Sequence, residues 1–389
     1  MTIQEMFERE DIYSIIESTM QEYFRGVWNR DVSVKISKKH FLKKILVYPR
    51  LGIVVPLFPS WKIIRSTYVW FDVQNNLIKK IVAWAYITLC FLSFGALADA
   101  SLEISDSVLF TNNTLYMPSN RKIRVYDYKE GYVDSILKVG FNDMYFKNEI
   151  AIRNNPPFDF ILEIINHGHR WYREKLLNGR CLVRCSGMEY VKFINQTIEH
   201  LKQFYSSHLR TVESSNYADS LNEEYKQLIN DLERIKGIKC GDKLRRVLQK
   251  MVTICHKKSS TIPISLTHGD LQTGNIYIDE DNSKLYIIDW ETVKVRSIWY
   301  DAATVLCSTR RKGKFSEMIN NRNKNNIQAN LFVFDDCKNR TIDLVAAVLV
   351  LEEMGFFLDE IDDLPGNMGS EIIERFEYEM DHIEWSTFG

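Results

Sequence analysis

The order of its sequence patterns predicts an α+β protein with a strand-rich lobe followed by a helical lobe. Short alternating or apolar stretches, such as residues 122–126 and 133–139, follow one another from about residue 106. Later in the chain the apolar residues recur at spacings of three and four, as in Val191, Ile194 and Ile198. Strands and helices in separate stretches are typical of the α+β class. The predicted divisions are an N-terminal extension over 1–105, a strand-rich N-lobe over 106–187 and a helical C-lobe over 188–389.

Composition places the chain among ordinary globular proteins. Its 389 residues are 45% hydrophobic and 26% charged, and the formal net charge is −1. A charge so close to zero gives no support for a nucleic-acid partner. The seven cysteines are scattered and include no CxxC pair, so reduced thiols are expected. Since the first residues also lack the apolar core of a signal peptide, a cytoplasmic location is predicted.

The strand predicted over residues 133–139 carries one lysine, Lys138, inside an apolar run. Burying a lysine is costly unless its ammonium has an anionic partner. Glu149, near the start of the next predicted helix, is the nearest carboxylate that could serve. A buried Lys138–Glu149 pair is one interpretation. The other is a strand-end lysine that reaches solvent and a glutamate that merely favours a helix N-terminus.

Residues 265–291 carry the most specific pattern in the chain. An HGD triplet at 268–270 is followed by Asn275, by two short apolar runs joined by a polar turn, and by a DWE triplet at 289–291. The two runs predict a hairpin across residues 279–284. Such a hairpin would bring the DWE triplet back beside the loop that carries the HGD triplet.

These residue types fit phosphoryl transfer. The reaction needs a carboxylate that orients and deprotonates the acceptor hydroxyl, and it needs oxygen ligands for Mg²⁺. Asp270 is the expected catalytic base, and Asn275 and Asp289 are the expected metal ligands. A polar loop and a hairpin with acidic turn residues would explain any one of these residues, but the joint pattern is much harder to meet by chance.

Three neighbouring residues have supporting or open roles. His268 is expected to be structural, donating hydrogen bonds that fix the loop. Asp301 is expected to be a buried acceptor that ties down a helix start or the catalytic loop. Glu291 could face either the metal or the acceptor, and the sequence does not decide between them.

The motifs HGDLQTGN and IIDWE resemble those of the aminoglycoside phosphotransferase and choline kinase branch of the protein-kinase-like fold. The resemblance covers about residues 106–389. It implies that ATP and Mg²⁺ are cofactors, that Asp270 matches the catalytic aspartate, and that Asn275 and Asp289 match the Mg²⁺ ligands. Lys138 and Glu149 would match the pair that positions ATP. The chain departs from the protein-kinase pattern because no GxGxxG precedes Lys138.

The end of the strand-rich part is the expected linker between the lobes. Residues 180–187 predict a strand that ends at a glycine, and helical periodicity follows. The backbone near Ser186 and Met188 would then meet the adenine edge of ATP. An ordinary strand-to-helix turn is the alternative interpretation.

The predicted function is an ATP- and Mg²⁺-dependent phosphotransferase that acts on a hydroxyl of a small molecule or glycan, such as a sugar, an aminoglycoside or an amino alcohol. The alternatives are a non-catalytic nucleotide-binding scaffold of the same fold, or a protein kinase. The presence of the base, the metal ligands and the lysine speaks against the scaffold, and IDWE in place of DFG speaks against the protein kinase. The acceptor itself is not encoded in these motifs.

Residues 81–98 form an uncharged stretch near the lower length limit of a membrane span. Lys79 and Lys80 precede it, so the positive-inside tendency would send the motif region to the side of the membrane away from ATP. A helix buried in the protein or packed on a lobe is therefore expected, with peripheral membrane contact through these residues as the alternative.

Two later stretches complete the sequence predictions. Residues 310–314 form a basic cluster that is expected to be a solvated loop, or else to attract an anionic acceptor. Residues 341–357 are strongly apolar and predict a helix buried in the helical lobe.

Overall fold

The computed structural model describes residues 10–39, 41–71, 77–106, 110–238, 240–335, 340–364 and 369–388. The chain divides into two units. The first, called here the strand-rich unit, comprises residues 1–146, 153–156 and 162–178. The second, the helical unit, comprises residues 147–152, 157–161 and 179–389. Helix α5 (Met144–Arg153) contributes residues to both units.

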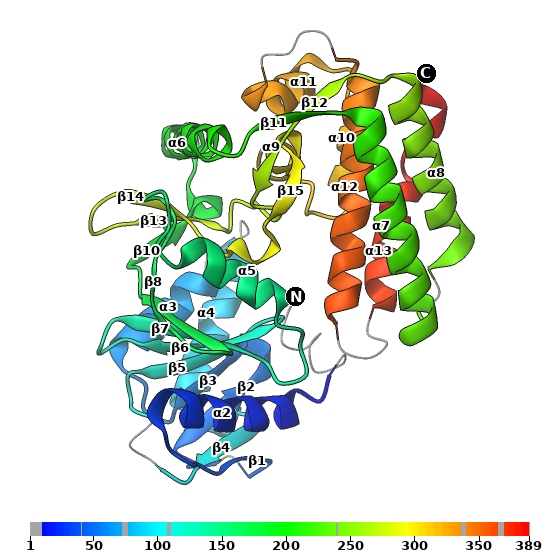
Figure 1. Cartoon of the computed structure of the whole chain (residues 1–389). Helices are drawn as coiled ribbons and strands as arrows, with labels where there is room; N and C mark the ends of the chain where they lie inside the picture. Colours follow the sequence, from blue (N-terminus) through cyan, green and yellow to red (C-terminus); the bar gives the residue numbers. More distant parts are fainter. Residues whose placement is uncertain are drawn as a thin grey trace. The chain divides into compact units, whose positions relative to one another are not determined.

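An antiparallel sheet of nine strands, counted over the described residues, forms the strand-rich unit (Figure 1). The strand order is β1-β4-β2-β3-β5-β6-β7-β9-β8. The strands are β1 (Val34–Ser37), β2 (Ile45–Tyr48), β3 (Ile53–Pro56), β4 (Ala100–Ile104), β5 (Thr114–Pro118), β6 (Lys122–Asp127), β7 (Tyr132–Leu137), β8 (Ile164–His167) and β9 (Trp171–Lys175). Strands from both sides of the expected boundary between residues 105 and 106 therefore share one sheet.

Helices cover both faces of this sheet because its strands are apolar on both sides. Successive side chains of a strand point to opposite faces. Accordingly, Val47 packs with helix α2 (Ile12–Trp28), whereas its neighbours Leu46 and Tyr48 pack with helices α3 (Trp61–Phe71) and α4 (Leu77–Leu92). Asp11 caps the N-terminus of α2 by accepting a hydrogen bond from the Ser14 backbone N–H.

Helix α4 agrees with the expectation of a helix packed on a lobe over residues 81–98, and it is not a helix buried on all sides. Its buried residues are Ile87 and Cys90, which face the sheet, while most of its other apolar side chains are exposed. The reason is that one side of the helix is enough to cover the sheet, so the opposite side faces solvent. No helix in the described part of the chain is long and apolar enough to span a membrane.

The helical unit is built around a bundle of long helices. Helices α7 (Ser214–Ile235), α8 (Gly241–Lys257) and α12 (Ile342–Asp363) pack against one another, and α13 (Ser370–Asp381) packs on α12 (Figure 1). Almost every residue of α12 from Leu344 to Leu358 is buried, which confirms the buried helix predicted over residues 341–357. The remaining helices are α6 (Gly187–Ser206), α9 (Trp299–Leu306), α10 (Lys314–Asn320) and α11 (Asn325–Leu331).

Two small antiparallel sheets in the helical unit position the motif region. One contains β10 (Gly179–Cys181), β13 (Ile276–Asp279) and β14 (Lys284–Ile287). The other contains β11 (Arg210–Glu213), β12 (Thr261–Thr267) and β15 (Lys294–Ser297). The β13–β14 hairpin turns where the sequence predicts it, with Ile276 paired to Ile287. The six cysteines in the described residues form no disulfide with one another, and Cys337 lies outside the described residues.

Candidate active site

The HGD triplet begins directly after strand β12 and starts the loop that leads to β13. Gly269 has φ +84°, a conformation that residues with a side chain rarely adopt. A Cβ atom at this position would lie 2.5 Å from both the Arg296 Nη1 and the Thr292 carbonyl oxygen. The loop can therefore follow this path only with glycine at residue 269.

Asp301, on helix α9, holds the start of this loop. Its Oδ2 accepts the backbone N–H of His268 at 2.7 Å, and its Oδ1 accepts the backbone N–H of Gly269 at 2.9 Å. The Tyr205 hydroxyl also donates to Oδ2, at 2.8 Å. Asp301 is completely buried. These bonds confirm the prediction that Asp301 is a buried acceptor that ties down the loop.

His268 links the loop to the segment after β14. Its ring Nε2 lies 2.9 Å from the Ile288 carbonyl oxygen, and the Asp270 backbone N–H lies 3.3 Å from its Nδ1. Both contacts are satisfied by the neutral tautomer that carries its proton on Nε2. The ring packs beside Trp290, with 4.7 Å between centroids. The expected structural role of His268 is confirmed.

The Asp270 carboxylate is surrounded by donors. Gln272 Nε2 donates to its two oxygens at 3.0 and 3.1 Å, and Arg310 Nε donates to Oδ1 at 3.0 Å. Burial raises the pKa of Asp270 to about 6, although the positive charge of Arg310 acts in the opposite direction. A carboxylate with a raised pKa accepts a proton more readily, as a general base must.

Arg310 departs from the expectation of a solvated basic loop, which holds for the exposed Arg311, Lys312 and Lys314. The Arg310 side chain is only 5% exposed. Nη1 donates to both oxygens of Glu353, at 2.8 Å each, and Nη2 donates to the Gly269 carbonyl at 2.8 Å and the Tyr300 hydroxyl at 2.6 Å. The sequence signal for this role is Glu353 itself, because a carboxylate inside the apolar helix 341–357 requires a buried cationic partner.

Asn275 and Asp289 are brought together by the hairpin. The Asn275 side-chain amide donates to the Asp270 carbonyl at 2.8 Å, which ties Asn275 to the catalytic loop. The backbone N–H of Ile288 donates to the Asn275 carbonyl at 2.9 Å, so Asp289 follows directly after a residue bonded to Asn275. Asp289 has φ 66° and ψ 54°, a left-handed conformation that Asp adopts more readily than most residues.

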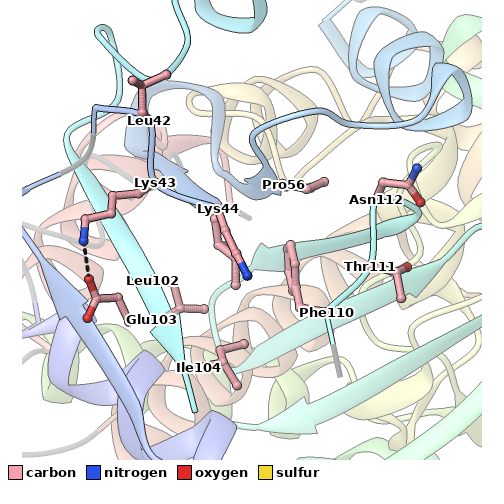
Figure 2. Close-up of a pocket in the computed structure, with 11 residues that line it drawn as sticks. Leu42, Lys43, Lys44, Pro56, Leu102, Glu103, Ile104, Phe110, Thr111 and Asn112 are labelled. Carbon is pink, nitrogen blue, oxygen red and sulfur yellow. Dashed lines mark hydrogen bonds and ion pairs between the residues drawn. The ribbon is translucent and has the colours of Figure 1, made fainter. Parts of the chain in front are cut away.

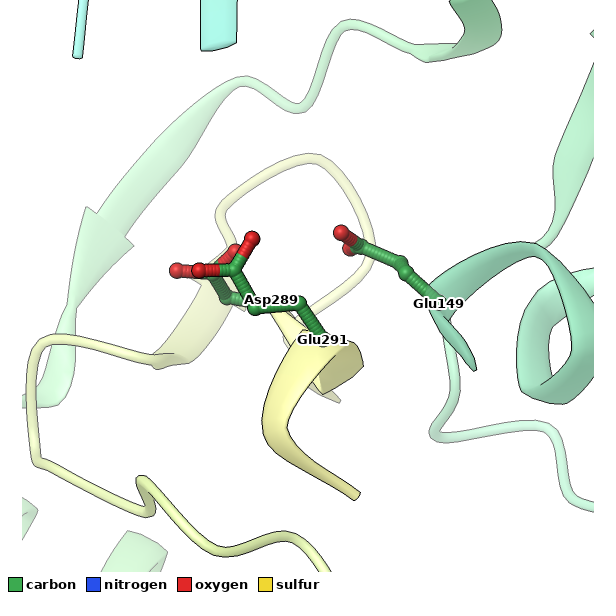
Figure 3. Close-up of side chains that lie close together, drawn as sticks. All are labelled: Glu149, Asp289 and Glu291. Atoms are coloured by element: carbon green, nitrogen blue, oxygen red, sulfur yellow. The ribbon is translucent and has the colours of Figure 1, made fainter. Parts of the chain in front are cut away.

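Asp289 is part of a carboxylate cluster that also contains Glu149 and Glu291 (Figure 3). One oxygen of each lies within 4.8 Å of the other two. Figure 3 shows Glu149 reaching from α5 toward the two motif carboxylates. Oxygen ligands of this kind are the ones that Mg²⁺ prefers, so the residues fit the metal that the sequence implies. The sequence left open whether Glu291 faces the metal or the acceptor. In the structure its carboxylate lies in the same cluster as that of Asp289.

Lys138 lies in the strand-rich unit and is fully buried. Its ammonium donates to the Glu10 Oε1 at 2.5 Å, in an ion pair whose two side chains are both excluded from solvent. Sequence reasoning missed Glu10, because an acidic residue in an acidic N-terminal stretch gives no sign of burial. Glu149 belongs to the helical unit, and its pairing with Lys138 stays a prediction.

The adenine contact expected near Ser186 and Met188 also stays a prediction. Ser186 precedes α6 in an extended conformation, Gly187 has φ +57°, and the Met188 side chain is 91% exposed. A separate cavity of about 560 Å³ lies in the strand-rich unit and is shown in Figure 2. Residues between Leu42 and Asn112 line it, so none of the predicted site residues borders it.

Residues 193–326 match the model of the phosphotransferase enzyme family. This segment is similar to that family. The matched segment contains Asp270, Asn275 and both motif carboxylates of the cluster, whereas Glu149 precedes it. The match confirms the resemblance drawn from the HGDLQTGN and IIDWE motifs. Together with a strand-rich part followed by a helical part, it also confirms the predicted protein-kinase-like α+β class.

Several solved structures are similar to this chain. An ethanolamine kinase from Plasmodium vivax has 14% identity and a TM-score of 0.45, with 83% of this chain and 93% of that chain covered. A choline kinase from Cryptosporidium parvum has 10% identity and a TM-score of 0.42, with 69% and 88% covered. An aminoglycoside phosphotransferase, solved with AMP-PNP and hygromycin B, has 11% identity and a TM-score of 0.41, with 76% and 97% covered. No curated protein sequence matches this chain.

Proposed function

We propose that this protein is an ATP- and Mg²⁺-dependent phosphotransferase whose acceptor is a hydroxyl group of a small molecule or glycan. The observation that carries the proposal is the joint position of Asp270, Asn275 and the Asp289 cluster within one unit. Asp270 hydrogen-bonds Asn275 through its backbone, and Asn275 hydrogen-bonds the residue before Asp289. A base and a set of metal ligands are thus connected by two hydrogen bonds.

In the proposed mechanism the oxygen of the acceptor hydroxyl attacks the terminal phosphorus of ATP, and Asp270 accepts the proton of that hydroxyl. The bond from phosphorus to the bridging oxygen breaks, and ADP leaves. Arg310 and Gln272 hold the Asp270 carboxylate in a fixed orientation before the reaction.

Asn275, Asp289 and Glu291 would hold Mg²⁺, which supplies positive charge against the phosphate oxygens of ATP. Lys138 and Glu149 are proposed to position the α- and β-phosphates, and the backbone near Ser186 and Met188 to contact adenine. The acceptor is expected to be a sugar, an aminoglycoside, an amino alcohol or a glycan fragment. Its pocket would be formed by parts of the fold outside the motif residues.

Transfer of labelled phosphate from ATP to a panel of those four acceptor classes tests the proposal. Asp270→Asn and Asp289→Asn should each reduce transfer by about a thousandfold or more, because each removes a charge that acts on the reacting groups. Asp281→Asn, in the exposed turn of the same hairpin, is the matched control and should retain activity. Thermal unfolding would establish that all three variants fold.

Turnover at the wild-type rate in either the Asp270 or the Asp289 variant would overturn the residue assignment. A wild-type protein that binds Mg-ATP in calorimetry but transfers phosphate to no acceptor would instead favour the nucleotide-binding scaffold.

A further inference from the structure

The outward side of helix α4 is apolar along its whole length. At 3.6 residues per turn, a single side of the helix carries its exposed aliphatic residues, each between 54% and 72% exposed. They are Leu77, Ile78, Ile81, Val82, Leu89 and Leu92. Thr88 is the one polar residue on this side of α4, and its hydroxyl bonds the Trp84 carbonyl and the Tyr68 hydroxyl. A helix that meets only water usually carries charged residues on this side.

The apolar surface continues beyond the end of α4. Phe94 packs edge-to-face on Phe58, with 6.3 Å between ring centroids, and its carbonyl accepts the Leu42 backbone N–H at 3.1 Å. Phe41, Leu42 and Phe58 are all about 60% exposed or more. The exposed residues of α4 together with Phe41, Leu42, Phe58 and Phe94 are called here the docking face. So many large exposed apolar side chains on one helix and in the segments beside its end mark an interaction site.

The charge of the surrounding sequence shows what kind of partner fits. Residues 32–98 contain ten Lys or Arg and a single acidic residue, Asp72, although the whole chain has a net charge of −1. Lys62 and Arg65 are exposed on α3, which packs against α4 on the same face of the sheet. Lys80 lies over the ring of Trp84, 5.0 Å from its centroid. The partner must therefore be apolar and anionic at once.

A bilayer that contains anionic lipids has both properties. Its acyl region accepts apolar side chains, its headgroups attract Lys and Arg, and the boundary between them favours Trp. Helix α4 has 16 residues and packs on the protein along one side, which suits a helix that lies in the plane of the interface. We propose that the docking face binds the protein to the surface of an anionic membrane.

The cavity in the strand-rich unit lies beside this face. Leu42 belongs to both, and the next two residues, Lys43 and Lys44, also line the cavity (Figure 2). Lys43 is paired with Glu103 at 2.9 Å. Two lysines thus directly follow the apolar Phe41 and Leu42 at the edge of the docking face, which extends the same combination of charge and hydrophobicity.

Flotation of the full chain with lipid vesicles tests the proposal. The wild-type protein should float with vesicles of phosphatidylcholine mixed with phosphatidylglycerol, and more weakly with phosphatidylcholine alone. A triple variant, Ile81→Ser, Val82→Ser and Leu89→Ser, should bind at least about tenfold more weakly, since three exposed apolar groups are lost. Val191→Ser with Ile235→Ser is the control, because it removes exposed apolar residues from the helical unit instead.

A second pair of variants tests the charge. Lys62→Gln with Arg65→Gln should weaken binding to the mixed vesicles by about fivefold for each charge lost and leave binding to phosphatidylcholine unchanged. Lys226→Gln, exposed on α7, should have no effect. Arg65 and Lys226 are exposed, whereas the Lys62 ammonium also donates to the Tyr128 carbonyl at 3.0 Å, so thermal unfolding should be measured to establish that the variants fold.

Three results would overturn the proposal. The wild-type chain could fail to float with mixed vesicles, or the triple variant could float as well as the wild type. Alternatively, light scattering could find a wild-type dimer that the triple variant separates into monomers, without vesicle binding by either protein. The docking face would then be covered by a second copy of the chain.

Discussion

Arg310 donates its Nε–H to the Oδ1 of Asp270 at 3.0 Å. The same guanidinium holds both oxygens of Glu353, so one buried cation serves two carboxylates. The Arg310 Cζ lies 3.5 Å from the centroid of the Phe356 ring, and this ring covers the guanidinium from solvent. The orientation of the proposed catalytic base therefore depends on an ion pair anchored in helix α12.

Replacing Arg310 by methionine should lower the free energy of unfolding by about 3–5 kcal/mol, because Glu353 would remain buried without its cation. Urea denaturation measures the change. Arg311→Met, at the exposed neighbouring position, is the control and should change stability by less than about 0.5 kcal/mol. Equal effects of the two substitutions would contradict a buried ion pair at Arg310.

Gly269→Ala should destabilise the protein by about 2 kcal/mol or more. The new Cβ would meet Arg296 and the Thr292 carbonyl at 2.5 Å, and φ +84° is unfavourable for alanine. Gly274→Ala is the control within the same loop, since no atom lies within 4 Å of the Cβ that it would add. Thermal unfolding compares the two variants, and a Gly269→Ala protein as stable as Gly274→Ala would contradict the observed loop geometry.

Glu291→Gln should weaken Mg²⁺ binding by about tenfold, because the cluster with Asp289 and Glu149 loses one of its three charges. Calorimetric titration of Mg²⁺ in the presence of AMP-PNP provides the measurement. The control is Glu374→Gln on α13, which removes an exposed carboxylate of the same type. If the Mg²⁺ affinity of Glu291→Gln equals that of the control, Glu291 faces the acceptor or another group rather than the metal.

Glu352 should make the stability of the protein depend on pH. Burial raises the pKa of its carboxyl to about 7, even though Ser297 and Tyr217 donate hydrogen bonds to it. The unfolded chain has a Glu pKa of about 4.3, so the folded state binds the proton more tightly. The resulting stabilisation is complete below about pH 4 and is lost as the pH rises through about 7.

Between pH 5 and pH 8 this contribution falls by about 2–3 kcal/mol. Urea denaturation at the two pH values should therefore give a smaller difference in Glu352→Gln than in the wild type. The Glu374→Gln control should keep the wild-type difference. A wild-type pH dependence in the Glu352 variant would show that another group causes it.

The sequence alone determined the groups that carry the proposed chemistry. Asp270, Asn275 and Asp289 lie within twenty residues of one another, and a hairpin predicted from local patterns is sufficient to bring them together. The role of Asp301 and the buried helix α12 were also predictable, because they follow from a short segment or from apolar periodicity. Local patterns of this kind are encoded in consecutive residues.

Only the tertiary structure decided the long-range pairs and the exposed side of α4. Lys138 pairs with Glu10 across 128 positions, Arg310 meets Asp270 across 40, and Glu149 joins a cluster whose other members lie more than 100 residues later. A single charged residue does not specify its partner, which is set by the packing of the whole unit. An apolar stretch likewise does not show which of its sides the protein covers, so the docking face became visible only once α4 was placed against the sheet.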